Sequence, residues 1–169
     1  MEEIEVPTEH LHEAIEDKAK EHDTGWSMYV AISTAIVAVL AALAGLMAGH
    51  HSNEALIDQI KASDQWAYYQ AKGIKAEIKQ IAVNGVVDTA SVEKYKKEQE
   101  EIKEKADEHE KSSEAHLSHH ILLARSVTLF QIAIAISAIA ILTRKKFMWY
   151  TGLLFSAIGT VFFVLGLIF

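Results

Sequence analysis

An uncharged run of 24 residues, Trp26–Gly49, constrains the fold of this chain more than any other feature. At about 1.5 Å of rise per residue, a helix over this run is roughly 36 Å long, which is enough to cross a bilayer. The run is too long for the apolar part of a secretory signal, and the residues before it are acidic rather than basic. It therefore predicts a retained transmembrane helix, with the lipid bilayer as its first partner.

One face of this helix carries only small residues, spaced alternately by four and three positions. Its members are Ala31, Ala35, Ala38, Ala42, Gly45 and Gly49. Small side chains let a second helix approach closely in lipid. The spacing therefore predicts that this span packs against another helix through this face.

Two further apolar runs predict two more spans, at 122–143 and 147–169, joined by a basic turn at 144–146. Gln131 lies inside the second span, and we expect its amide to bond to a neighbouring helix rather than to line a pore. The third span repeats glycine every seven residues, which predicts a contact between protomers or with a partner. These glycines are Gly152, Gly159 and Gly166.

Between the first two spans, residues 50–121 are charged but keep a helical period. They predict a soluble α-helical hairpin with its turn near 84–91, capped by Asp88 or Ser91, in which the first two spans extend into a long antiparallel coiled coil. The fold class is therefore an all-α membrane protein with three transmembrane helices.

Two series at heptad spacing predict the residues that face each other in the hairpin, with residue n opposite roughly residue 175 − n. The first series is His50, Asn53, Ile57, Ile60, Asp64, Ala67, Ala71, Ile74, Ile78 and Ile81. The second series is Val92, Tyr95, Gln99, Ile102, Ala106, His109, Ser113, His116, His120, Leu123, Val127 and Phe130. Asp64 and His109 would then form a polar pair that fixes the register.

The first 25 residues are an acidic segment in which a thin apolar stripe predicts one short amphipathic helix. Glu9 and His12 have the E-x-x-H spacing that supplies ligands in di-iron bundles. Such a site needs further carboxylates from other helices, and an acidic surface helix produces this spacing by chance. We favour chance here.

Histidine is the over-represented reactive residue type, with nine copies. Five of them fall where the hairpin is expected to meet the membrane: His50, His51, His116, His119 and His120. His116 and His120 are four residues apart, the spacing by which a helix presents two imidazoles to one metal ion. A metal site and a pH-responsive cluster are two interpretations. The third, which we favour, is plain hydrogen bonding at the wet end of the hairpin.

An aromatic patch in the first stalk helix contains Trp66, Tyr68 and Tyr69. These residues fall outside the predicted seam, and a monomeric stalk has little reason to expose three large rings. The patch therefore predicts a contact between protomers or with a partner protein.

Composition and missing motifs exclude several classes of function. The net charge of −7 leaves no basic face for nucleic acid. The chain has no cysteine, and hence no disulfide, thiolate metal site or cysteine nucleophile. It also lacks a glycine-rich phosphate loop, a G-x-S-x-G elbow and an H-E-x-x-H helix. We therefore expect no enzyme and no cofactor.

Basic residues near the span ends predict the orientation. Lys18, Lys20 and the basic turn lie on one side, against Lys61, Lys111 and Arg125 on the other. The larger number favours a cytoplasmic amino terminus in a bacterial inner membrane, with the hairpin and the carboxyl terminus in the periplasm.

Three segments show a family resemblance: Gly49–Ala76, Glu93–Glu110 and Leu129–Gly159. They resemble the bacterial family of domains of unknown function numbered 4337, and ASDQWAYYQAK (Ala62–Lys72) is the most specific part. The resemblance implies a three-span bacterial membrane protein with a helical soluble hairpin. It implies no reaction, and no functional residue is carried over from it.

Our leading hypothesis is a non-enzymatic, self-associating membrane protein, a homo-oligomer with a structural or scaffolding role through its hairpin. Its contacts would be other copies of the chain or another membrane protein. One alternative is an oligomeric channel or transport component. The other is a metal- or pH-responsive module that uses the membrane-proximal histidines.

Overall fold

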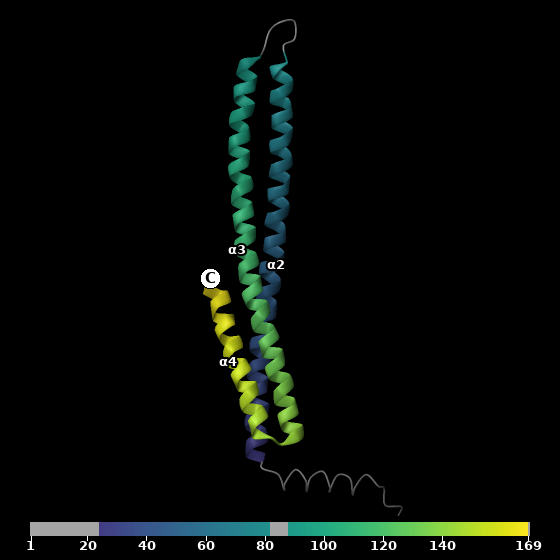
Figure 1. Cartoon of the computed structure of the whole chain (residues 1–169), viewed down its shortest axis with the longest axis vertical. Coiled ribbons are helices and arrows are strands. Elements are labelled where there is room, and N and C mark those ends of the chain that lie inside the picture. The colour runs from purple at the N-terminus through teal and green to yellow at the C-terminus, as the bar shows by residue number, and fades with distance from the viewer. Residues whose placement is uncertain (1–23, 82–87, 169) are drawn as a thin grey trace, which may run out of the picture.

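The computed structural model of the chain describes residues 24–81 and 88–168. These residues form three α-helices: α2 (Thr24–Gln80), α3 (Thr89–Thr143) and α4 (Lys146–Ile168). α2 and α3 run side by side as a long hairpin, and α4 turns back along one half of α3 (Figure 1). The all-helical hairpin is thus confirmed. The acidic segment with Glu9 and His12, and the centre of the turn, lie outside the described residues.

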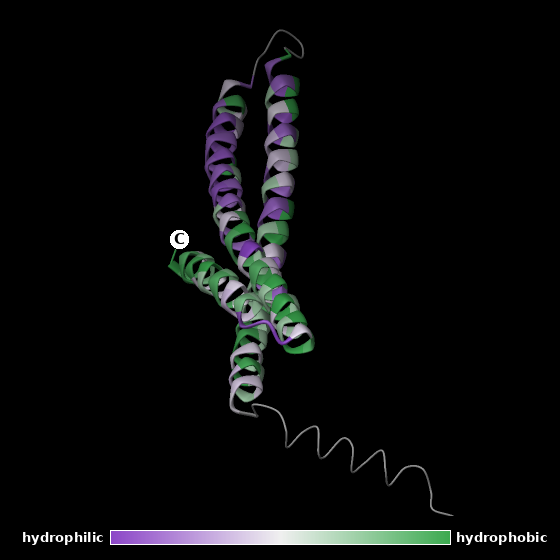
Figure 2. Cartoon of the chain, turned by 60° about the horizontal axis from the view of Figure 1, so that its bottom comes forward, coloured by the Kyte–Doolittle hydropathy of each residue, from purple (hydrophilic) through white to green (hydrophobic). Residues whose placement is uncertain are grey.

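Each of the three helices contains a stretch that is long and apolar enough to cross a membrane. Apolar residues gather in the lower halves of α2 and α3 and in α4, whereas the upper half of the hairpin is mainly hydrophilic (Figure 2). α2 and α3 have 57 and 55 residues. At 1.5 Å per residue each is about 80–85 Å long, far more than a bilayer requires.

Short local signals set the helix ends that the structure describes. Asp88 caps α3, because its Oδ1 accepts a hydrogen bond of 3.1 Å from the amide of Ser91. α3 ends at Thr143, and its C-cap, Arg144, takes the left-handed conformation with φ 55°. α4 then begins at Lys146, so the basic turn between the two spans is shorter by one residue than we predicted.

The predicted seam of α3 is confirmed along its whole length. All twelve of its residues, from Val92 to Phe130, are buried or half-buried. Leu123 and Phe130 have no exposed surface, and Ile102 and Ala106 are also buried. The heptad spacing of α3 therefore identified the side that α2 covers.

The predicted seam of α2 is wrong. Its residues are exposed, including Ile57 at 43% and Ile78 at 59%. The side of α2 that meets α3 instead carries small or polar residues: Ala44, Ala48, Ala55, Asp58, Ala62 and Ala76. Because α3 contributes bulky seam residues such as Phe130, the two helices approach closely only where α2 is small.

The register also differs from the prediction. Three hydrogen bonds join His120 to Ala48, Ser113 to Ala55 and Gln99 to Tyr69. Residue n of α2 therefore faces residue 168 − n of α3. This is one heptad away from the predicted register, and it separates Asp64 from His109.

α4 packs on α3 through its glycines. A Cβ added to Gly159 would lie 3.0 Å from the ring of Phe130, and one added to Gly166 would lie 2.9 Å from Leu123. A Cβ at Gly152 would lie 3.1 Å from the carbonyl oxygen of Ala133. The glycine spacing does mark a close contact between helices, but α3 of the same chain fills it. These glycines are therefore unavailable for the contact between protomers that we predicted.

Candidate functional site

A cluster of five histidines lies where the apolar half of the hairpin meets the charged half. We call it the histidine junction: His50 and His51 of α2, with His116, His119 and His120 of α3. The Nδ1 atoms of His51 and His116 are 3.0 Å apart. The rings of His51 and His119 stack, with 4.7 Å between their centroids and 12° between their planes. The structure therefore brings the predicted residues together from both helices.

Two of these imidazoles bond to backbone carbonyls. His120 Nδ1 donates to the carbonyl of Ala48 at 2.9 Å, and His119 Nδ1 donates to the carbonyl of Gly166 at 2.9 Å. Gly166 is in the last turn of α4, where a carbonyl has no partner inside its own helix. The histidine junction therefore ties all three helices together.

This arrangement does not resemble a metal site. Within residues 24–81 and 88–168, no group of three or more histidine or acidic side chains is placed to hold a metal ion. His116 and His120, which we considered as ligands of one metal, bond instead to His51 and to the carbonyl of Ala48. The geometry favours the hydrogen-bonding interpretation.

The environment of His51 disfavours its protonated form. Burial lowers the pKa of His51, and the neighbouring His119, His116 and His50 lower it further, while Glu54 opposes them. In the 3.0 Å hydrogen bond between the Nδ1 atoms of His51 and His116, one nitrogen donates its N–H and the other must accept with a free lone pair, so both rings cannot be protonated without repulsion. The contact between His51 and His116 thus depends on a neutral ring.

We expect acid to loosen the histidine junction. Since folding lowers the pKa of His51, its contribution to stability is present above its unfolded value of about 6.5 and is lost as the pH falls through the lower folded value. The melting temperature of the purified protein should fall by a few degrees between pH 7.5 and pH 5.5. The His51→Gln variant should lose most of this dependence, and an unchanged dependence in that variant would assign the effect to other groups.

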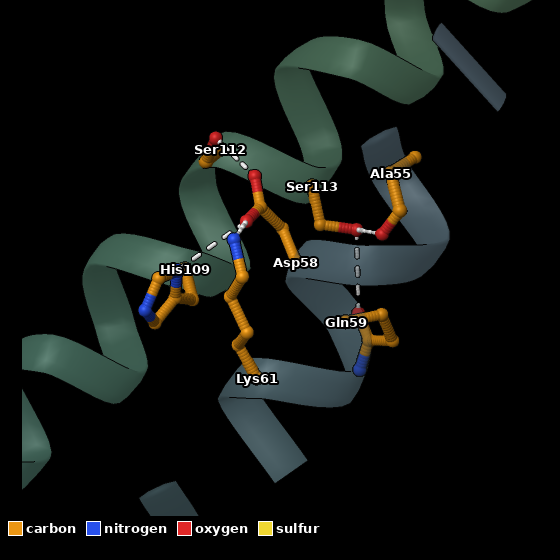
Figure 3. A network of polar contacts seen from close by, with 7 residues as sticks. All are labelled: Ala55, Asp58, Gln59, Lys61, His109, Ser112 and Ser113. Atoms are coloured by element: carbon orange, nitrogen blue, oxygen red, sulfur yellow. Dashed lines mark hydrogen bonds and ion pairs between the residues drawn. The ribbon is translucent and has the colours of Figure 1, made fainter. Parts of the chain in front are cut away.

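A second polar network lies higher in the hairpin, around the buried carboxylate of Asp58 (Figure 3). Its Oδ2 accepts a 2.6 Å hydrogen bond from Ser112. Its Oδ1 accepts one from Lys61 at 3.1 Å and lies 3.4 Å from Nδ1 of His109. The bonds from Ser112 and Lys61 lower the pKa of Asp58 and keep it charged. The acidic partner of His109 is therefore Asp58, whereas Asp64 is exposed.

The aromatic patch is used largely within the hairpin. Trp66 is half-buried, donates a 2.8 Å hydrogen bond to Glu110 and meets the ring of Tyr69 edge-on. Tyr69 accepts from Gln99 through its backbone carbonyl. Tyr68 is 48% exposed, with the ammonium of Lys72 over its ring. Of the three aromatic residues predicted to contact a partner, Tyr68 is the most exposed.

Comparison with known families shows which family the chain belongs to. The model of the family described as Domain of unknown function (DUF4337) matches residues 26–169. The chain belongs to the DUF4337 family. No curated protein and no solved structure matches the chain. The DUF4337 match spans all three helices and both polar networks, which confirms the family resemblance seen in the sequence.

The sequence reasoning missed the residues that line the α2 seam of this DUF4337 protein. Asp58 is the main omission on α2, together with Ser112 of α3, which bonds to it. Ser113, whose hydroxyl donates to the carbonyl of Ala55 at 2.8 Å, was already a member of the predicted α3 series. A signal was present, because Asp58 stands at heptad distance from His51 and Ala44. A charged residue at such a position resembles a solvated one, so periodicity alone did not separate the two.

Proposed function

We propose that this DUF4337 protein is a non-enzymatic integral membrane protein that self-associates and holds its helical hairpin outside the bilayer in a structural or scaffolding role. One observation carries the proposal: the small-residue face of α2 is exposed from Ala31 to Gly49. A Cβ added to Gly49 would meet nothing within 4 Å, and one at Gly45 would meet Val127 alone, at 4.0 Å. The described residues of the chain leave this face uncovered.

α3 continues the same open face. In an antiparallel pair of helices, the residues that directly follow the seam residues in the sequence lie on the same side of the pair in both helices. On α3 these are Thr128, Gln131, Ala135 and Ala138, all exposed. α4 covers the other side, where Trp149 donates a 3.1 Å hydrogen bond to Ser33. The open face is therefore a two-helix surface of small side chains.

Gln131 supports association through this surface. Its side chain is exposed, and it has no hydrogen-bond partner among the described residues. An amide that faces hydrocarbon without a partner is costly, and glutamine often bonds across to a neighbouring helix. Since none of the three described helices covers Gln131, the neighbour is expected to be a second protomer or another membrane protein.

The proposal includes an orientation. The start of α2 and the turn between α3 and α4 lie at one end of the molecule (Figure 1). The basic residues 144–146 are at that end, and the predicted excess of basic residues places it in the cytoplasm. The hairpin and the carboxyl terminus then lie in the periplasm of a bacterium with this chain in its inner membrane.

Two alternatives draw on the same observations. A channel or transport component would line its pore with the face that carries Gln131, but pores usually carry several polar or charged positions. A pH-responsive module has the more specific support, because the 3.0 Å contact between His51 and His116 requires a neutral ring. Such a response is compatible with the structural role.

Leucine substitutions on the open face test the proposal. Gly45 and Gly49 are exposed, and a Cβ added at either position meets no atom closer than 4.0 Å. Leucine also favours a helix over glycine by roughly 1 kcal/mol. The monomer fold should therefore be retained while the oligomer dissociates at about tenfold higher concentration, measured by native mass spectrometry in detergent. Val161→Leu, on an exposed side of α4, is the matched control. Unchanged association in both glycine variants would refute the open face as an interface.

A further inference from the structure

A second exposed surface of α2 points directly away from α3. We call it the outer stripe, and its residues follow one another at heptad spacing on both sides of the histidine junction. In the apolar half they are Ile32, Ile36, Val39, Leu43 and Leu46; in the hairpin they are Ile57, Ile60, Asp64, Ala67, Ala71, Ile74 and Ile78. All of them are exposed.

Lipid can cover only the first half of this stripe. The part from Ile57 to Ile78 lies in the hydrophilic half of the hairpin, where apolar segments still recur along α2 (Figure 2). Its four isoleucines are 43–59% exposed, and at 1.5 Å per residue they extend over about 32 Å. An exposed stripe of this length that is apolar at every position except Asp64 marks an interaction surface.

We propose that the outer stripe is the contact through which the α2 helices of two or more copies of this chain pack in parallel and in register. The inference rests on the proposed self-association and names its surface outside the membrane. The heptad phase runs unbroken from Ile32 to Ile78. A single helix that covers the whole stripe must follow α2 through the bilayer and out of it, and α2 of a second copy does so in the same direction.

The residue types within the stripe fit a homotypic bundle. Isoleucine occupies both of the alternating heptad positions, with Ile57 and Ile78 at one and Ile60 and Ile74 at the other. This pattern favours parallel bundles of three or four helices over two. Asp64 is the single charge within the stripe between Ile57 and Ile78. A lone polar residue of this kind sets register and helix number at a cost in stability.

The flanks of the stripe favour parallel packing. One flank carries Lys61, Tyr68 and Lys75, and the other carries Ser63, Gln70 and Glu77. In a parallel bundle each flank meets the opposite flank of its neighbour, so lysines face neutral or acidic side chains. An antiparallel pair would set the lysine flanks against each other.

Single cysteines provide a direct test, because the chain has none of its own. In membranes treated with a mild oxidant, Ile60→Cys and Ile74→Cys should each crosslink to the same position of a second copy, in more than half of the chains. Glu104→Cys, exposed on α3, is the matched control and should stay at background. Background crosslinking at both stripe positions would overturn the inference.

Substitution of Asp64 distinguishes a second copy from a different partner. In a homotypic bundle the Asp64 carboxylates converge and repel one another, so Asp64→Asn should strengthen the oligomer on the order of tenfold in dissociation constant. Ile74→Glu should weaken it by at least as much. If Asp64→Asn weakens association instead, a basic group of another protein faces Asp64 and the homotypic contact is refuted.

These outcomes separate the inference from the proposed function. An oligomer that dissociates in Gly45→Leu but never crosslinks through Ile74→Cys would overturn the outer stripe and leave membrane self-association standing. A chain that is monomeric under all conditions, without crosslinks at either surface, would overturn both.

Discussion

Gly159→Leu is expected to detach α4 from the hairpin. A Cβ at this position would lie 3.0 Å from two ring atoms of Phe130 and 3.2 Å from Cβ of Leu129, and leucine adds three more carbons. Phe130 cannot move aside, because it is fully buried in a cluster with Val37, Ala44 and Ala133. Overpacking of this kind costs about 1–3 kcal/mol or more. The melting temperature in detergent should fall by about 5–10 °C, as followed by circular dichroism.

Two variants sharpen this test. Gly152→Ala adds one carbon, which would lie 3.1 Å from the backbone carbonyl oxygen of Ala133 and 2.9 Å from Oγ of Ser137. It should also lower the melting temperature, but by less than Gly159→Leu does. Gly49→Leu is the control, since its added carbon meets nothing within 4 Å. Equal melting temperatures for Gly159→Leu and Gly49→Leu would contradict the packing of α4 on α3.

Ala62→Leu is expected to force the two arms of the hairpin apart. Ala62 and Ala106 have no exposed surface, and the observed register places them opposite each other across the seam. Leucine adds three carbons where two alanines face each other, so the helices can no longer approach as closely. Overpacking of this kind lowers the free energy of unfolding by about 1–3 kcal/mol. Thermal unfolding should shift to lower temperature by about 5 °C or more. Hydrogen exchange of the amides near Ala62 and Ala106 should rise in parallel.

Alanines on other faces provide the controls. Ala115→Leu, exposed on α3, should leave the hairpin unchanged. Ala67→Leu tests the seam directly, because Ala67 belongs to the heptad series that the sequence favoured and the structure exposes. If Ala67→Leu destabilises the hairpin and Ala62→Leu does not, α2 meets α3 through the face of Ala67 and the observed seam of α2 is contradicted.

The contrast between these alanines shows what periodicity could predict. The α3 seam was predictable because its large residues, such as Leu123 and Phe130, recur at one heptad phase. α2 carries two stripes with the same spacing, one rich in alanine and one rich in isoleucine. Hydrophobicity favours the isoleucines, whereas the fit against bulky α3 residues requires the alanines. That fit depends on the opposing helix, which a local pattern does not contain.

In the histidine junction, too, the local sequence predicted the position of the residues but not their partners. The five histidines were expected to gather because their positions place them at the end of the apolar segments, and they do gather. Their individual partners could not be predicted, since the bond from His119 to Gly166 depends on where α4 ends. Likewise, the spacing of Gly152, Gly159 and Gly166 predicted a close contact but not that their own α3 would fill it.

Counting the chains in one membrane particle measures whether the open surface of α2 binds other copies of this chain. The full chain would be extracted with its surrounding lipid into nanodiscs and weighed by native mass spectrometry. We expect two or more copies per particle for the natural sequence, and single chains when Gly45→Leu and Ile74→Glu are combined. A natural sequence that yields only single chains would contradict this binding.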